Sequence, residues 1–170
     1  MMAAIVFMAG FAAAWWVGGG LVGQAPAGLV AIGPVISVIL ILVARARLKA
    51  EPEPSPDERK RIGKIVAWAS GGEGLALFLA ANVLINAGLS PYLATAFAVI
   101  VGLHFLPLAK VIPVPIYYVT ALLLVLAGVA GLAIDVAHRP LVISVAAALV
   151  LWLTCVARLA KVEPTVAPVV

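Results

Sequence analysis

Long apolar stretches separated by short polar segments make up most of the chain. Six stretches are long enough to cross a bilayer, because a transmembrane helix needs about 20 predominantly apolar residues. Most connections are short, which makes consecutive helices antiparallel neighbours. The pattern predicts one all-α domain over residues 1–170, a polytopic membrane bundle of six transmembrane helices in three antiparallel hairpins. The predicted helices are Ala3–Val22, Gly28–Ala44, Lys64–Asn86, Pro91–Ala109, Pro115–Ile134 and Leu141–Ala160.

The share of hydrophobic residues is larger than a soluble protein needs for its core. Hydrophobic residues make up 65% of the chain and charged residues 11%, and the mean hydropathy is +1.23. Soluble domains have about 45–50% apolar and about 25% charged residues. In a bilayer, by contrast, apolar side chains can face outward all round a bundle. The lipid bilayer is therefore the expected surroundings of this chain.

The lysines and arginines are distributed unequally between the two ends of the predicted hairpins. Arg139 alone lies at one end, and the other ten of the eleven lie at the opposite end. These ten are Arg45, Arg47, Lys49, Arg59, Lys60, Arg61, Lys64, Lys110, Arg158 and Lys161. Because cationic segments near helix ends stay in the cytoplasm, both termini should be cytoplasmic. The net charge of +4 then reflects topology, and no nucleic-acid partner is expected.

Two segments near the N-terminus need an interpretation of their own. The connection at about 45–63 contains "EPEPSPDERK", which is rich in proline and charge and predicts a solvated cytoplasmic linker. Ala25-Pro26-Ala27 is similar to a signal-peptide cleavage site. However, "MMAAIV" has no positive charge, and the apolar run exceeds the usual length of about 7–15 residues. A retained first helix is therefore preferred over a cleaved one.

One carboxyl group lies deep in an apolar helix, in the segment Ser70-Gly71-Gly72-Glu73-Gly74. If this helix starts near Lys64, Glu73 lies about 13 Å along it at about 1.5 Å per residue. Ionisable residues at such depth are costly and are functional candidates by default. The other acidic residues are predicted outside the hydrocarbon: Glu51, Glu53, Asp57, Glu58 and Glu163 in the cytoplasm, and Asp135 near the outer surface.

His104 is the second ionisable residue at depth. It precedes Lys110 by six residues, which is roughly 9 Å from the cytoplasmic end of its helix. The third and fourth helices form a hairpin, so a Glu73–His104 pair is geometrically allowed, and its two groups would titrate together. The alternative is equally open: a protonated Glu73 bonds a backbone carbonyl or a serine, and His104 finds a separate partner.

The surroundings of Glu73 on its helix suggest what else could line such a centre. At about 100° per residue, Glu73 shares a face with Val66, Ala69, Ser70, Leu77 and Ala80, whereas Asn82 lies on the opposite side near the outer end. Ser70 and Asn82 complete the set of candidate ligand- or proton-site residues. Gly71, Gly72 and Gly74 indicate either unwound backbone at a site or close packing on a neighbouring helix.

Other chemistry is poorly represented in the sequence. There is no Ser/His/Asp set, metal-ligand spacing or phosphate loop, so no catalytic, metal or cofactor site is expected. His138 is predicted in an outer connection and His104 toward the cytoplasm, so a haem bridged by the two within one chain is not expected, although two copies of His104 could pair in a dimer. The aromatic residues near helix ends are predicted to be interfacial anchors. They are Trp68, Tyr92, Tyr117, Tyr118 and Trp152.

The segment "GLHFLPLAK", Gly102 to Lys110, resembles an element of small bacterial multi-pass integral membrane proteins of uncharacterised families. In these proteins G-L-H-F is followed by P-L-A. The resemblance implies a bacterial inner-membrane location and adds weight to His104, Phe105 and Pro107. It implies no activity.

Three functions fit these residues. The preferred one is a small carrier or channel for a solute or proton, centred on Glu73 and His104, because a deep carboxyl is expensive to retain for packing alone. The alternative is a non-catalytic accessory or assembly subunit, with a second copy or a larger membrane complex as its partner. A membrane-embedded enzyme acting on a lipid or quinone ranks last, because few polar groups converge.

Overall fold

The computed structural model describes residues 2–48, 55–112 and 114–161, and these are helical apart from turns and short connections. Six helices follow one another, with short 3₁₀ turns η2 (Ser90–Tyr92) before α4 and η3 (Gly131–Ala133) after α5. All six are long and apolar enough to cross a membrane, so the predicted six-helix bundle is confirmed. The helices are α1 (Met2–Val22), α2 (Ala27–Arg47), α3 (Pro56–Asn86), α4 (Leu93–Val111), α5 (Ile116–Ala130) and α6 (Arg139–Ala160).

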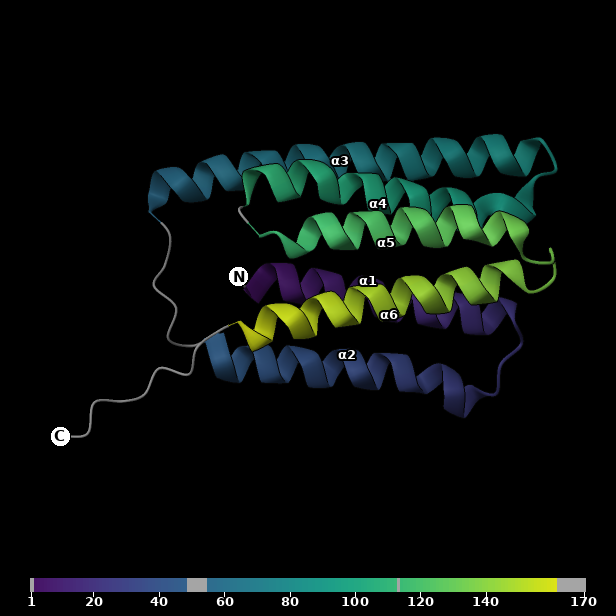
Figure 1. Ribbon diagram of the computed structural model, residues 1–170, viewed down its shortest axis with the longest axis horizontal. Helices are drawn as coiled ribbons and strands as arrows, with labels where there is room; N and C mark the ends of the chain where they lie inside the picture. Colours follow the sequence, from purple (N-terminus) through teal and green to yellow (C-terminus); the bar gives the residue numbers. More distant parts are fainter. Residues whose placement is uncertain (1, 49–54, 113, 162–170) are drawn as a thin grey trace.

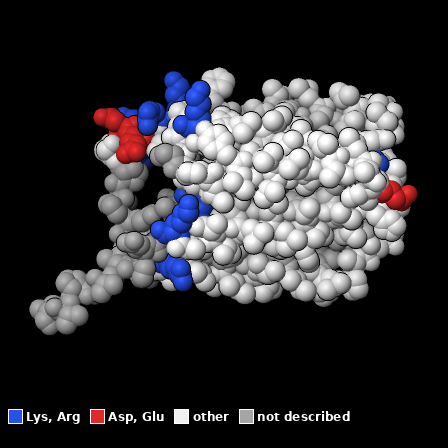
Figure 2. Space-filling model, in the orientation of Figure 1, with Lys and Arg blue, Asp and Glu red and all other residues white. Residues whose placement is uncertain are grey.

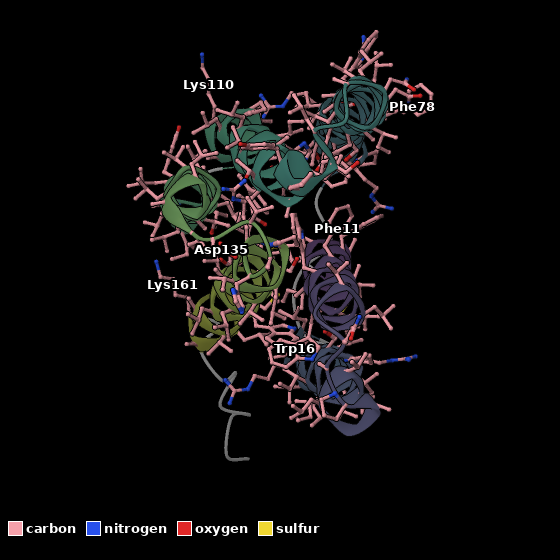
Figure 3. The ribbon with its side chains drawn as sticks, turned by 90° about the vertical axis from the view of Figure 1, so that its right-hand side faces the viewer. Phe11, Trp16, Phe78, Lys110, Asp135 and Lys161 are labelled. Atoms are coloured by element: carbon pink, nitrogen blue, oxygen red, sulfur yellow. The ribbon has the colours of Figure 1, made fainter. Side chains whose placement is uncertain are left out.

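The helices run alternately up and down and form an elongated bundle (Figure 1). Each predicted hairpin is present, since α1 packs on α2, α3 on α4 and α5 on α6. The most extensive interfaces, however, join helices of different hairpins, namely α4 with α5 and α1 with α6. Viewed end-on, α3 and α2 lie at the two opposite edges of the bundle (Figure 3). The helix that carries Glu73 is therefore an outermost helix.

The largest difference from the predicted boundaries is the start of α3. This helix begins at Pro56, eight residues before the predicted Lys64. Ser55 caps it by accepting a hydrogen bond from the backbone N–H of Glu58 at 3.3 Å, and proline and acidic residues in the first turn favour a helix start. The predicted linker at about 45–63 is thus partly helical, and its residues 49–54, including Glu51 and Glu53, lie outside the described residues.

The charged side chains follow the predicted asymmetry. Apart from Arg139, the described lysines and arginines gather at the end of the bundle where α1 begins and α6 ends (Figure 2), and Lys49 lies outside the described residues. At the other end, Asp135 lies in the turn between α5 and α6, and Arg139 is the first residue of α6. This distribution is what the positive-inside rule uses to orient a bundle. Glu163, which is predicted to be cytoplasmic, lies outside the described residues.

A hydrogen-bonded serine and tryptophan join three helices in the core. Ser37 of α2 donates to the carbonyl oxygen of Ala9 in α1 at 2.7 Å and accepts from Trp152 Nε1 of α6 at 2.9 Å. Ser37 and Trp152 are both buried. Trp152 is therefore part of the core, and the prediction that it is an interfacial anchor is wrong.

Replacing Ser37 with alanine is expected to lower the free energy of unfolding by about 1 kcal/mol, because the buried Trp152 N–H loses its acceptor. The measurement is unfolding of the detergent-solubilised protein in a titration with SDS. Ser70→Ala is the matched control, because Ser70 is exposed on α3, and its effect should stay within about 0.5 kcal/mol. Equal effects of the two substitutions would contradict a structural role for the Ser37 hydroxyl.

Candidate functional site

Glu73 and His104 meet at the interface between α3 and α4. The distance from His104 Nδ1 to Glu73 Oε2 is 3.5 Å, and the two side chains are only 10% and 9% exposed, respectively. Ala69 of α3, whose carbonyl contacts His104 of α4, is small and lets the two helices approach. The structure therefore brings together the two ionisable residues that the sequence placed at matching depth.

The same imidazole nitrogen also contacts the backbone of α3. His104 Nδ1 lies 3.2 Å from the carbonyl oxygen of Ala69, one turn before Glu73. Because a carbonyl oxygen can only accept, Nδ1 carries a proton in this arrangement. That N–H is bonded to the Ala69 carbonyl, and the Glu73 carboxyl oxygen lies 3.5 Å from the same nitrogen as an ion-pair contact. His104 thus remains attached to α3 through the backbone even when the side chain at position 73 changes.

On its other side, His104 adjoins a row of aromatic rings that leads into the core. The rings of His104 and Phe105 are edge-to-face at 5.9 Å between centroids, and those of Phe105 and Tyr117 at 5.5 Å. Tyr117 accepts a hydrogen bond from Nη1 of Arg158, whose guanidinium lies 5.1 Å from the tyrosine ring centroid. The row connects the Glu73–His104 pair to a buried cation in α6.

Tyr117 and Arg158 are buried, which sequence reasoning missed. The prediction that Tyr117 is an interfacial anchor is wrong, and Arg158 was interpreted only as a topology signal. The only clue in the sequence was that Arg158 lies within the last apolar helix, before its final residue. This clue is weak, because a basic residue at a cytoplasmic helix end usually faces the headgroups.

Ser70 and Asn82 do not join the pair to form an enclosed centre. The side chain of Ser70 is exposed. Asn82 is also exposed and donates from Nδ2 to the carbonyl oxygen of Phe78, on its own helix, at 2.8 Å. Asn82 follows Glu73 by nine residues, which is about 13 Å along the helix. The predicted set of four side chains is therefore corrected to a contacting pair.

The glycines beside Glu73 fit neither predicted interpretation. The helix α3 is continuous through them, and a Cβ atom added at Gly71, Gly72 or Gly74 would meet nothing within 4 Å. They therefore neither unwind the helix nor pack against another helix among the described residues. Gly71 and Gly72 instead form a notch of about 380 Å³ with Ala67, Trp68 and Leu75. At about 100° per residue, Gly71 lies on the side of α3 opposite Glu73.

Residues 56–161 match the profile of a known family, the "Family of unknown function (DUF7010)". The match covers more than half of the chain, so the chain belongs to this family. No curated protein and no solved structure matches the chain. The matched segment contains α3 to α6, and with them Glu73, His104 and Arg158, whereas α1 and α2 precede it.

Proposed function

We propose that this protein is a small carrier or channel that moves a proton, alone or with a small solute, and that Glu73 and His104 are its protonatable centre. The contact of 3.5 Å between the carboxyl group and the imidazole carries the proposal. Two ionisable groups held together inside apolar helices are costly to retain. Two ionisable groups that interact strongly titrate as one coupled unit, which is the property that a proton-linked transporter needs.

In this proposal, α3 is the element that moves. Its extensive contacts are with α4 and the adjoining turn η2, and none of its residues, all of which are described, is fully buried. Three glycines beside Glu73 weaken the local helix and have no packing partner within the described chain. Gain or loss of a proton by the Glu73–His104 pair changes the attraction between the two helices, so the position of α3 relative to α4 follows the protonation state.

Purified protein in liposomes tests the proposal. A potassium gradient with valinomycin sets an inside-negative potential, and a trapped pH-sensitive dye reports proton entry. We expect acidification of the lumen to be faster than in protein-free liposomes prepared in parallel. A proton-conducting function would be contradicted if liposomes with and without the protein acidify at equal rates. This comparison is made with both directions of the potential and over a range of external pH.

A non-catalytic accessory or assembly subunit is the second candidate. The feature that favours it is the outward side of α3, where Trp68 is 75% exposed beside the notch at Gly71 and Gly72. Small residues next to a large one suit the packing of another transmembrane helix. Stable co-purification with a larger complex, without proton flux in liposomes, would favour this candidate over the first.

The proposed location is the bacterial inner membrane, with both termini in the cytoplasm. The asymmetry of lysine and arginine supports this orientation, because it follows the positive-inside rule. In this orientation the Glu73–His104 pair lies in the inner half of the bilayer. Protons would then reach it over a shorter path from the cytoplasm than from the outside.

A further inference from the structure

The outer end of the bundle contains a buried cation of its own. Arg139, the first residue of α6, is only 5% exposed. Asp135 lies in the turn before it at this end of the bundle (Figure 3), but it is paired with His138 at 3.6 Å and both side chains are 74% exposed. Arg139 therefore has no carboxylate partner among the described residues of this end. Its guanidinium is held by groups of another kind.

Three backbone carbonyls and one aromatic ring hold the guanidinium. Nε donates to Gly131 at 2.9 Å, and Nη2 donates to Leu132 at 3.4 Å and to Ile134 at 3.1 Å. The guanidinium carbon lies 4.6 Å from the centroid of the Tyr92 ring. These carbonyls belong to the turn after α5, so Arg139 satisfies a helix C-terminus and its dipole. The two N–H groups of Nη1 have no hydrogen-bond partner in the described chain.

Nη1 of Arg139 and Oγ1 of Thr95 are the two buried side-chain atoms without a hydrogen-bond partner in the described chain. The two residues have one neighbour in common, Gly131: Arg139 bonds its carbonyl, and Thr95 Oγ1 lies 3.6 Å from the position of a Gly131 Cβ. The two described threonines that are buried as whole residues, Thr120 and Thr154, behave differently. Thr120 and Thr154 contact the carbonyl four residues earlier and contact each other.

From these contacts we infer that Arg139 Nη1 and Thr95 Oγ1 form a buried binding site for one hydrogen-bond-accepting atom, the oxygen of a water molecule or a halide ion. Both protein groups can donate to the same acceptor, since the hydroxyl hydrogen of threonine rotates. Buried donors left unpaired are costly, and internal waters typically make about three hydrogen bonds to such groups. The bound atom would join α4 to the turn between α5 and α6, at the end opposite the basic cluster.

Whether the Thr95→Val substitution lowers or raises the melting temperature tests this site. Thr95→Val keeps the shape of the side chain and removes the hydroxyl. If an acceptor is bound, we expect the full-length protein in detergent to melt about 2–4 °C lower, since roughly 1 kcal/mol corresponds to this shift at this chain length. If nothing accepts from Thr95, valine removes an unpaired polar group, and the melting temperature stays unchanged or rises. That result would overturn the proposal.

Thr95→Ser is the matched control, because it keeps the hydroxyl, and we expect it to melt higher than Thr95→Val.

Exchange of chloride for gluconate identifies the bound atom. A fall in the melting temperature of the wild type that is absent in Thr95→Val indicates a halide, and no fall indicates a water. A high-resolution structure grown in bromide provides the direct check. Anomalous density between Nη1 and Oγ1 or ordered water density there supports the site, whereas a direct Arg139–Thr95 hydrogen bond contradicts it.

Discussion

Replacing Glu73 with glutamine is expected to reduce proton flux in liposomes at least tenfold, to about the rate of protein-free liposomes, while the protein remains folded. Glutamine has the size of glutamate, and its amide oxygen can take the place of the carboxyl oxygen beside His104. It cannot gain or lose a proton in the physiological range, so the coupled pair loses one of its two titrating groups. The contact of His104 with the Ala69 carbonyl, at 3.2 Å, keeps α3 attached to α4.

The control for this prediction is Asn82→Leu on the same helix. Asn82 is exposed, and its side chain contacts only its own helix among the described partners, so the flux should stay within about twofold of the wild type. Size-exclusion profiles of both variants establish that the protein is folded. Wild-type flux in the Glu73→Gln variant would exclude Glu73 from the conduction step and leave the accessory-subunit candidate.

The spans and the common level of Glu73 and His104 could be predicted because they depend on local properties. Span length follows from the bilayer thickness, and a short connection between the third and fourth helices makes them neighbours. With the rise per residue fixed, two polar residues at similar distances from the same membrane surface come to the same level. The contact at 3.5 Å follows from these constraints together with the facing sides of the helices.

Properties that depend on which helix faces meet could not be predicted. Arg158 and Lys161 are similar in sequence context, but Arg158 is buried against Tyr117 whereas Lys161 is exposed. The start of α3 was missed for a different reason: the proline and charge of "EPEPSPDERK" were interpreted as a linker, although Ser55 and Pro56 are also a helix start signal. Caps and linkers share this pattern, and only the helix-forming residues downstream distinguish the two.

The glycines show most clearly how packing separates residues that look alike in sequence. Gly102 of α4 lies against α5, and a Cβ atom there would come within 2.8 Å of the Val125 side chain, 2.9 Å of the Ala121 carbonyl oxygen and 3.0 Å of the Val125 nitrogen. Gly72 of α3 would meet nothing within 4 Å. The sequence drew attention to Gly72 because of its neighbour Glu73, yet Gly102 is one of the positions where a Cβ atom has no room.

Gly102→Ala is therefore expected to lower the free energy of unfolding by about 1–3 kcal/mol, because backbone atoms of α5 cannot move aside as a side chain could. The α4–α5 interface is among the most extensive in the bundle, so the helices must separate along its length. Unfolding in SDS, followed by tryptophan fluorescence, gives the measurement. Gly72→Ala is the matched control and should raise the stability by roughly 0.5–1 kcal/mol, because alanine is the better helix former.

The control also bears on function. If Gly72→Ala lowers the stability as much as Gly102→Ala does, a helix outside the described chain must cover the notch at Gly71 and Gly72 in the assembled protein. A second copy or a larger complex would then occupy the outward side of α3, and α3 would be packed between this partner and α4. Movement of α3 with the protonation of Glu73 and His104 would be hindered, which would favour the accessory-subunit candidate. A stabilising or neutral effect leaves this side to lipid and keeps α3 free to move against α4.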